Sequence, residues 1–509
     1  LDLRNSNIRF GRVRFDRPLV ALITDTTGLM NLNWYLDMLA SSDTSSAGKK
    51  SRISIDQAEL NDARFNLIDR RSRPGKSLID FGNLHVGRIS AEVRNFTVKD
   101  DSVNFRIARL SFIEKNGFAV ENFAGRVTLA DHDILFNDIQ IKTGKTDLKA
   151  DNVYLTADSA GSFARFNERV RLDILLRRSI VSSADLQYFL PFLEGTDETG
   201  EVSGRVTGFV EELKGRNINV RYGAGTLLDC DFDFSGLSSI QDAFIHLGIN
   251  TLVTSASDIE RISLPGKGKI RLPEVMHKLG QITFDGSFTG FVSDFVTYGK
   301  IGTEKGHIRT DLSVRPWQGS RFKIKGLIAG SGIELGDLTG NRDLLGKMSM
   351  ETSIDGFASS MEKIEGDLTG VIDSIQINNY LYRNVAINGL FTEKTWDGSI
   401  SISDRNIRMD LLGLFDFRNA LPEFDFTLNL AESNLYELNI DKSDSTSALS
   451  MLVTANFRGN NIDNLYGEIK LLNSTLNKFG NKLELYNFSL KAFTEANRPA
   501  ISLRTDFID

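Results

Sequence analysis

The sequence has little of what cross-links a fold or interrupts strands. Its 509 residues include one cysteine, Cys230, so no disulfide can form within the chain. Proline occurs only 8 times, as expected of long strands, because proline removes a backbone donor from a β-ladder. No apolar run approaches the roughly 18 residues of a membrane-spanning helix. These absences favour many strands without covalent cross-links.

Concentrated charge and catalytic motifs are also lacking. Lys and Arg total 60 against 67 Asp and Glu, which gives a net charge of −7, whereas nucleic-acid binding usually needs a concentrated basic surface. The five histidines are scattered, with no pair at metal-ligand spacing. No Gly-x-Ser-x-Gly motif occurs, and residues 144–146 lack the upstream glycine of a phosphate-binding loop. We expect no enzyme, no cofactor and no nucleic-acid partner.

The segment around Cys230 superficially resembles a calcium-binding loop. Asp229, Asp231 and Asp233 alternate along it, but the next glycine is Gly236, which is not the sixth position of such a loop. We therefore expect the three aspartates on the polar face of a strand. Cys230 is in phase with the apolar residues, which predicts a small, buried side chain.

What the sequence has in abundance is alternation of apolar and polar residues, from about residue 51 to the end. The clearest case is 423–430, where four apolar residues alternate with four polar ones. Successive strand side chains point to opposite faces, so the pattern predicts a sheet with one apolar side. The predicted apolar lining comprises Val127, Leu129, Ile139, Ile141, Val153, Leu155, Val170, Leu172, Ile174, Met348, Met350, Ile354, Ile400, Ile402, Phe424, Phe426, Leu428 and Leu430.

The number of strands limits the architecture. At roughly 14 residues per strand and turn, the chain holds on the order of 30 strands, more than the usual limit of about ten for an open sheet. The strands form either several β-sandwiches or one continuous sheet that curls into an apolar groove. Proline- and glycine-rich linkers should separate sandwiches, and the sequence has none. We therefore predict an all-β protein in which residues 1–509 form one elongated, repeating groove of mostly antiparallel strands.

A few segments interrupt this pattern. Short helices are predicted near residues 31–40, 183–194 and 272–279, with Ser183 as the N-cap of the second and Pro273 in the first turn of the third. Exposed loops are predicted at 41–50, 70–76 and 441–447. A loose strand-turn-strand repeat is also visible: 202–210 matches 284–292, and 364–372 matches 462–469, at irregular spacing.

The apolar stripes have two interpretations. In the first, they are the ordinary cores of sandwiches. In the second, they line a trough that holds acyl chains, while the polar residues face water. Burying one CH₂ group contributes about 0.8 kcal/mol, so a lined groove would hold a lipid with two long chains. The absence of domain breaks favours the trough.

Several segments resemble a known family. Residues 53–69 look like the strand pair typical of AsmA-like envelope proteins. Residues 110–118, residues 184–186 with 191–193, and the Thr-Gly-Phe-Val sequences at 207–210 and 289–292 resemble the TamB family of translocation and assembly module proteins. The similarity extends over most of the chain and consists of diffuse strand patterns.

The resemblance implies a β-taco, or repeating-groove, fold in the periplasm of a diderm bacterium. Such proteins are anchored in the inner membrane by an N-terminal helix and reach an Omp85-type outer-membrane partner through a C-terminal domain. The chain begins at Leu1 and ends at Asp509 within a strand-like run, so we expect both segments to lie outside it. The family offers no catalytic residues to assign here.

The sequence therefore predicts a periplasmic segment whose groove carries phospholipid between the two membranes, with a linked role in outer-membrane biogenesis and phospholipid acyl chains as ligands. One alternative is a chaperone-like β-scaffold that assists outer-membrane protein assembly and secretion through its sheet edges. Another is an adhesin or a carbohydrate-acting β-helix. An adhesin or β-helix of this kind predicts aromatic and acidic clusters on an outer face at fixed repeat spacing, and the sequence shows none.

Overall fold

The chain folds almost entirely as β-sheet. The computed structural model describes residues 7–31, 52–72, 78–99, 102–130, 132–237, 239, 241–264, 268–360, 363–461, 464–495 and 498–506. About 70% of the chain is strand and 7% helix. Within the described residues, 27 strands belong to one sheet that is not closed, and two more form a separate hairpin. The predicted all-β class, with one long open sheet and few short helices, is confirmed.

The chain divides into two compact units. Unit 1 comprises Leu1–Leu272 and Ser287–Val292, and unit 2 comprises Pro273–Gly286 and Ser293–Asp509. Strand β16, Gln281–Phe291, contributes residues to both units.

Unit 1 is a meander in which each strand from β3 to β13 pairs antiparallel with the next. At one margin, β1 and β2 both lie parallel to β3 and are separated by Arg17 and Pro18. The strands are β1 Asn7–Asp16, β2 Leu19–Thr24, β3 Arg52–Asp69, β4 Asn83–Lys99, β5 Ser102–Glu114, β6 Ala119–Ala130, β7 Asp133–Lys142, β8 Asp147–Ala157, β9 Val170–Ser182, β10 Thr199–Phe209, β11 Glu212–Tyr222, β12 Thr226–Ser235, β13 Phe244–Ser255, and the small hairpin β14 Ser263–Leu264 with β15 Gly268–Lys269.

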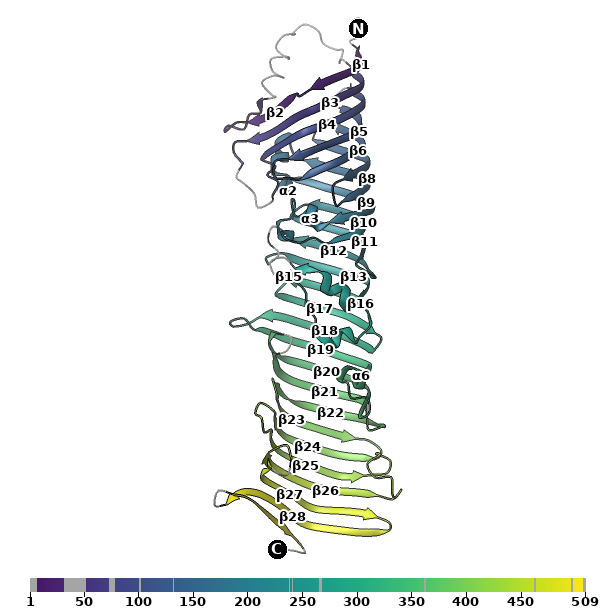
Figure 1. Ribbon diagram of the computed structural model, residues 1–509, viewed down its shortest axis with the longest axis vertical. Helices are drawn as coiled ribbons and strands as arrows, with labels where there is room; N and C mark the ends of the chain where they lie inside the picture. The colour runs from purple at the N-terminus through teal and green to yellow at the C-terminus, as the bar shows by residue number, and fades with distance from the viewer. Residues whose placement is uncertain are drawn as a thin grey trace. The chain divides into compact units, whose positions relative to one another are not determined.

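Unit 2 repeats this antiparallel connectivity from β17 to β29, with the strands side by side in chain order (Figure 1). Its strands are β17 Asp294–Thr303, β18 Gly306–Pro316, β19 Phe322–Glu334, β20 Leu345–Ser360, β21 Lys363–Ile377, β22 Tyr380–Thr392, β23 Thr395–Ser403, β24 Ile407–Asp416, β25 Glu423–Ser433, β26 Ala448–Arg458, β27 Tyr466–Lys478, β28 Asn481–Glu495 and β29 Arg498–Thr505. Hairpin connections of a few residues join most of them, as a meander requires.

The helices are short and lie between strands. They are the 3-10 turns η1 Ala160–Arg165 and η2 Pro191–Leu193 and the α-helices α2 Phe166–Arg169, α3 Ser183–Leu186, α4 Ala256–Arg261, α5 Glu274–His277 and α6 Leu335–Thr339. The helical segments predicted near 183–194 and 272–279 are present. The one predicted near 31–40 lies, after its first residue, outside the described residues, as does the loop predicted at 41–50.

The predicted cap of α3 is wrong by one residue. Ser182, in extended conformation at the end of β9, accepts a hydrogen bond from the backbone N–H of Ala184 at 3.3 Å. The hydroxyl of Ser183 instead accepts from the backbone N–H of Glu198 at 2.8 Å. A residue with extended backbone is the one whose side chain can turn back to the first N–H groups of a helix.

The predicted repeat corresponds to a backbone feature. The first glycine of each repeated segment, Gly204, Gly286, Gly366 and Gly467, has a positive φ of 131°, 155°, 159° and 136°, respectively. At Gly366 an added Cβ would lie 2.4 Å from the Cα of Gly356 on the neighbouring strand. The repeated glycine therefore marks a place where adjacent strands approach closely.

Little of the sheet is covered by a second layer. The chain exposes 30302 Å², whereas a compact monomer of its 56.7 kDa mass would expose about 19,000 Å². Within the described residues, the hydrophobic cluster of buried side chains is small and consists of Ile407, Leu430 and Leu438. Most apolar side chains must therefore be sheltered by their neighbours on the same sheet.

Candidate functional site

In unit 2 the strand registers align apolar residues of successive strands into ladders. The first ladder runs from β20 to β26 through Met350, Ile372, Val385, Ile402, Met409, Leu430 and Met451. The second runs from β22 to β28 through Ile387, Ile400, Leu411, Leu428, Val453, Leu471 and Phe488. The third is aromatic and crosses β22 to β26 through Phe391, Trp396, Phe415, Phe424 and Phe457. Because residues an even number apart on a regular strand share a face, the three ladders form one apolar face.

The two faces of the unit 2 sheet differ in exposure. On β25, Phe424, Phe426 and Leu428 are half-buried and Leu430 is buried, while the polar residues between them are exposed. Neighbouring leucines on β24 show the same contrast, since Leu411 on the apolar face is half-buried and Leu412 on the other face is 64% exposed. The apolar face is thus sheltered without being sealed.

Unit 1 has an apolar face of the same kind. One ladder crosses β3 to β9 through Ile53, Val98, Val103, Leu129, Ile134, Leu155 and Leu172. A second crosses β5 to β10 through Phe105, Val127, Phe136, Val153, Ile174 and Val206. The opposite face has exposed residues such as Tyr154, Arg171 and Arg205.

β-Bulges keep this face continuous where the sequence alternation fails. In β7, Asp138 and Ile139 lie opposite the single residue Gly125 of β6, and Asp138 has a left-handed φ of 51°. An extra residue in one strand reverses the order of faces beyond it. Ile139 and Ile141 therefore return to the apolar face of Phe136.

The structure places all the predicted lining residues on the apolar face of their own unit. Five of them are buried: Val127, Ile139, Val170, Leu172 and Leu430. The others are half-buried, and none is exposed. In unit 2 the registers bring Ile400 and Ile402 together with the apolar residues of β25 through the intervening strand β24.

That intervening strand, β24, is not among the strands predicted from the sequence. Met409, Leu411 and Phe415 alternate along β24 as the rule requires, but Leu412 and Leu414 point to the opposite face and hide the pattern. The sequence does contain a signal for this strand. Gly413 lies between the two leucines, and Asp410 and Asp416 flank the apolar run, so these three residues indicate a strand.

Glycines form a fourth row of the unit 2 face, between the second and third ladders. Gly389, Gly398 and Gly413 are consecutive partners across β22, β23 and β24. A Cβ at Gly389 would lie 2.7 Å from Cζ2 of Trp396, so the indole ring lies against the backbone there. Glycine rows let aromatic side chains lie flat on the sheet, which packs the face without a second layer.

The aromatic ladder is held together by ring contacts. The ring centroids of Phe415 and Phe426 are 5.5 Å apart with nearly parallel planes, and those of Phe424 and Phe457 are 4.8 Å apart. Phe415 and Phe424 meet edge to face at 5.9 Å. Such arrangements contribute about 0.5–1.5 kcal/mol per pair beyond the area they bury.

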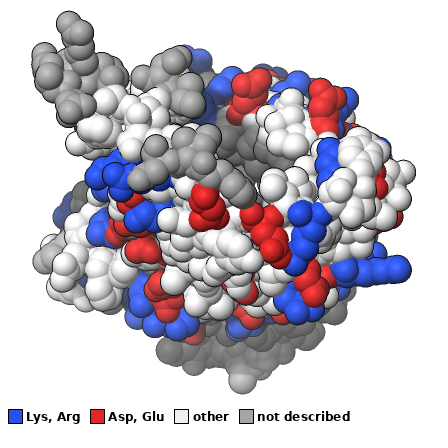
Figure 2. Space-filling view, turned by 90° about the horizontal axis from the view of Figure 1, so that it is seen from below, with Lys and Arg blue, Asp and Glu red and all other residues white. Residues whose placement is uncertain are grey.

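Charges lie on the opposite face and are paired in many places. In unit 1 the Arg205 guanidinium binds Asp173 through contacts of 2.9 and 2.6 Å and holds the pKa of that carboxyl below its ordinary value. In unit 2 the pKa of Asp355 is lowered by Lys325 and then by Lys323, which lie 3.0 and 3.3 Å away. Lys, Arg, Asp and Glu are interspersed on the surface that Figure 2 shows, without a large area of one sign.

The region around Cys230 agrees with the predictions. Cys230 is 3% exposed, and its burial, with Asp229 and Asp231 nearby, raises its pKa to about 11. Asp231 accepts a hydrogen bond from the backbone N–H of Asn217, and Asp233 pairs with Arg216 at 2.7 Å. Within the described residues no group of His, Cys, Asp and Glu has the arrangement of a metal site.

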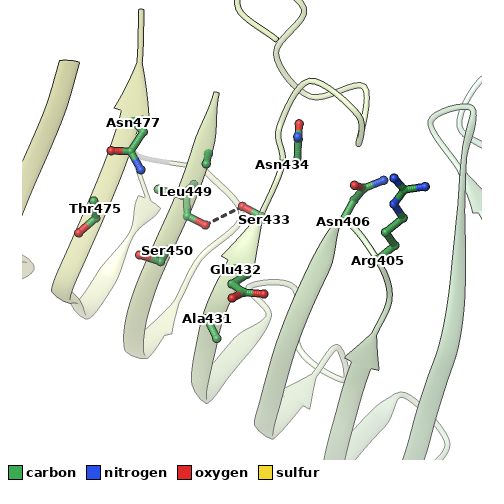
Figure 3. Close-up of a pocket in the computed structure, with 11 residues that line it drawn as sticks. Arg405, Asn406, Ala431, Glu432, Ser433, Asn434, Leu449, Ser450, Thr475 and Asn477 are labelled. Carbon is green, nitrogen blue, oxygen red and sulfur yellow. Dashed lines mark hydrogen bonds between the residues drawn. The ribbon is translucent and has the colours of Figure 1, made fainter. Parts of the chain in front are cut away.

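A hollow of about 340 Å³ lies at the margin of β24 to β27, on the polar side of the sheet (Figure 3). Arg405, Asn406, Glu432 and Asn477 line it, and the Ser433 hydroxyl in it donates to the carbonyl oxygen of Leu449 at 2.7 Å. None of the residues that line it belongs to the three ladders, and its apolar lining residue Leu449 packs at the edge of the buried cluster. The hollow is thus separate from the apolar face.

Comparison with known proteins gives no relative for this chain. No family model, no curated protein and no solved structure matches it. Within the described residues, no helix has the length and apolar character needed to cross a membrane.

Proposed function

We propose that this chain is a lipid-carrying segment of a TamB-like periplasmic protein. Its apolar face holds the acyl chains of phospholipids and conducts them between the inner and outer membranes. The observation that supports this function is the set of ladders on the apolar face, which continue from strand to strand within each unit while remaining half-exposed. A soluble protein rarely leaves so much apolar surface without a partner.

The ladders suit a chain-like apolar ligand. Adjacent strands are about 4.8 Å apart, so a ladder presents an apolar side chain at each such step. Each buried methylene contributes about 0.8 kcal/mol. Successive ladder positions offer nearly equal contacts, so a bound acyl chain can move by one strand without losing most of its contact.

The remaining parts of the proposal follow from the family resemblance. Residues 53–69 resemble AsmA-like envelope proteins, and residues 110–118, residues 184–186 with 191–193, and the Thr-Gly-Phe-Val sequences resemble the TamB family. A TamB-like protein would be anchored in the inner membrane and would act with an Omp85-type partner in the outer membrane. Its function would include a role in outer-membrane biogenesis. The apolar face needs no catalytic group, and we propose a transporter segment and not an enzyme.

Native mass spectrometry of the chain purified from a diderm host under mild conditions tests this function. Phe426→Asp with Leu428→Asp places two carboxylates on the apolar face of β25. Thr427→Asp with Asn429→Asp places two on the other face of the same strand and is the matched control. We expect co-purifying phospholipid in the wild type and the control, and its loss in the first variant, with circular dichroism of β-structure unchanged in both.

A lipid-free wild type that stays folded would contradict the proposal. It would favour the alternative of a β-scaffold that assists outer-membrane protein assembly through its sheet edges. In that case an unfolded outer-membrane protein should bind the wild type and both variants alike, because pairing at an edge uses backbone groups and not the apolar face.

A further inference from the structure

The connection between β25 and β26 packs against the apolar face of unit 2. We call this connection, residues 434–447, the strap. It starts where the backbone N–H of Asn434 donates to the carbonyl oxygen of Asn406, and it closes where the N–H of Leu435 donates to Ser447. In between, it returns over the apolar side of the sheet.

The strap inserts a leucine into the first ladder. Leu438 is 0% exposed and packs in the buried cluster with Ile407 and Leu430. The partly buried side chains around this cluster are Tyr380, Tyr382, Ile402, Met409, Leu449 and Met451. Ile402, Met409, Leu430 and Met451 are consecutive members of the first ladder. Leu438 therefore occupies space that the ladder would otherwise offer to a ligand.

The strap narrows the face at this point. From β23 to β26, the cluster around Leu438 takes in four members of the first ladder, whereas no member of the second ladder packs against that cluster. An acyl chain that follows the first ladder from Ile372 and Val385 toward β26 meets the strap. To continue along that ladder it must take the place of Leu438.

Polar contacts at the rim hold the strap in position. Asn378 and Asn439 exchange hydrogen bonds, each side-chain N–H donating to the carbonyl oxygen of the other, at 2.7 and 2.9 Å. Lys478 pairs with Asp441 at 2.6 Å and lowers the pKa of that carboxyl. The backbone N–H of Phe479 donates to Asp444 at 2.5 Å. These polar groups lie near the surface, so water can hydrate them when the strap moves away, and the contacts contribute little against its opening.

Displacement of the strap from the cluster is favourable in free energy only when a ligand takes its place. Lifting the strap exposes Leu438 and the cluster beneath it to water, which opposes opening in the empty protein. An acyl chain that enters the same space buries the cluster again. A ligand that binds the open state alone shifts the population toward that state.

We propose that the cluster beneath the strap is a further acyl-chain site, and that Leu438 occupies it until the end of an acyl chain displaces the strap. The ligand class is the linear hydrocarbon chain of a glycerophospholipid. The inference rests on the proposed function and adds to it a defined site and the contact that limits access to it.

A disulfide across the rim tests the inference. Asn378→Cys with Asn439→Cys, made together with Cys230→Ala, places two thiols where the reciprocal hydrogen bonds now hold the strap. The probe is phosphatidylethanolamine with a photoactivatable diazirine near the acyl-chain end, supplied in phosphatidylethanolamine–phosphatidylglycerol vesicles. Peptide mass spectrometry then locates the adducts in the oxidised protein and in the same protein after reduction. The Cys230→Ala single variant under both conditions is the control.

We expect oxidation to reduce labelling of Tyr382, Met409 and Leu430 several-fold and reduction to restore it, with labelling of Leu428 and Leu471 on the second ladder unchanged. Leu438→Ala, which leaves the hydrogen bonds of the rim in place, should increase labelling of the cluster. Equal labelling of the cluster with the strap locked or free would overturn the inference. So would labelling of the second ladder with none at the cluster in either state, and both results would leave the proposed function standing. Absence of adducts anywhere would instead contradict the proposed function.

Discussion

Units 1 and 2 build the same kind of apolar face by different means. In unit 1, nine of the ten antiparallel pairings described from β3 to β13 contain a register shift. In unit 2, four of the twelve described from β17 to β29 do. Unit 1 therefore relies on bulges, which bend and twist a strand locally. Unit 2 has more regular strands, with glycines beneath aromatic rings.

The difference shows that continuity of a face does not require alternation in the sequence. In β25 of unit 2 the two coincide over 423–430. In β7 of unit 1 the alternation is interrupted at Asp138, and the face continues because Asp138 takes a left-handed conformation. The position of the extra residue, and not its side chain, determines which way the following residues point.

Removing the bulge residue of β7 should have the largest effect. Deletion of Asp138 either turns Ile139 and Ile141 to the polar face or moves them out of register with β8. We expect a loss of about 2–4 kcal/mol in the free energy of unfolding, from about 1.5–3 kcal/mol for the buried Ile139 and a smaller contribution from the half-buried Ile141. Urea denaturation followed by circular dichroism measures this loss.

A second deletion should restore most of that loss. Strand β8 also has an extra residue relative to β9, because Ala150 pairs with Leu176 and Asn152 with Leu175, which leaves Asp151 over. Asp138 and Asp151 lie opposite each other in β7 and β8. Deleting both removes the extra residue of β7 against β6 and that of β8 against β9 at this point, and it keeps the register between β7 and β8. If the double deletion is as unstable as the single one, bulges are not what keeps the unit 1 face in register.

Filling a glycine position on the unit 2 face should have the next largest effect. A Cβ at Gly413 would lie 2.3 Å from the carbonyl oxygen of Asp425 and 2.4 Å from Cβ of Phe426. Gly413→Ala should cost about 1–3 kcal/mol, the usual range for overpacking. Gly248→Ala in unit 1 is the control, because the nearest atom there is 4.0 Å away, and it should be neutral or stabilise by up to about 1 kcal/mol. Equal losses for both would show that glycine rows are not a packing device of unit 2.

A buried carboxylate of unit 1 should have a moderate, pH-dependent effect. Asp258 is 1% exposed and accepts hydrogen bonds from the backbone N–H groups of Ala224, Gly225 and Thr226 at 2.9, 2.9 and 3.1 Å. These bonds, that from Ala224 first, lower its pKa. Asp258→Asn should cost about 1–3 kcal/mol at neutral pH, because a buried N–H loses a charged acceptor.

The sign of the pH dependence follows from the lowered pKa of Asp258. Its contribution is complete above the unfolded pKa of aspartate, about 3.9. It is lost as the pH falls through the lower, folded value, where the native carboxylate takes up a proton. The stability difference between wild type and Asp258→Asn should therefore shrink below about pH 4. If the difference in stability stayed constant down to about pH 2, the lowered pKa of Asp258 would be contradicted.

The smallest effect is expected at the corresponding contact of unit 2. Asp337 on α6 pairs with Lys305 and Arg342, and the Lys305 contact is the main cause of its lowered pKa. Contacts between charged side chains near the surface are screened by salt, unlike bonds to buried backbone groups. Asp337→Asn should therefore destabilise less than Asp258→Asn. Added salt should remove the effect of Asp337→Asn and leave that of Asp258→Asn unchanged. Urea denaturation of both variants at low and high salt compares them.

Much of this fold could be predicted from sequence, because alternation determines the face of a regular strand. The lining residues of β25 and β23 follow directly from it. Strand β24 could not be recognised in this way, since Leu412 and Leu414 face outward in a run that is almost wholly apolar. Bulges at residues such as Asp138 also escape prediction, because Asp is common in turns as well and so does not by itself indicate a left-handed position within a strand.

The strap shows another limit of sequence-based prediction. The polar stretch 441–447 predicts an exposed loop, and most of it is exposed, although Ser447 is buried. The anchoring residue, Leu438, lies just before that stretch, and its burial depends on side chains from β22, β24 and β25. Contacts between such distant segments leave no local pattern in the sequence.

The most direct test of the account uses neighbouring residues that face opposite ways in each unit. Ile174 on the apolar face is half-buried and Leu175 is 41% exposed on the other face, and Leu411 and Leu412 form the same kind of pair in unit 2. Replace each in turn by a photoreactive benzoylphenylalanine and irradiate the four proteins with phosphatidylethanolamine–phosphatidylglycerol vesicles. We predict phospholipid adducts at Ile174 and Leu411 and not at Leu175 or Leu412. Adducts at all four positions, or only at the exposed pair, would contradict the claim that the apolar face is the lipid-binding surface.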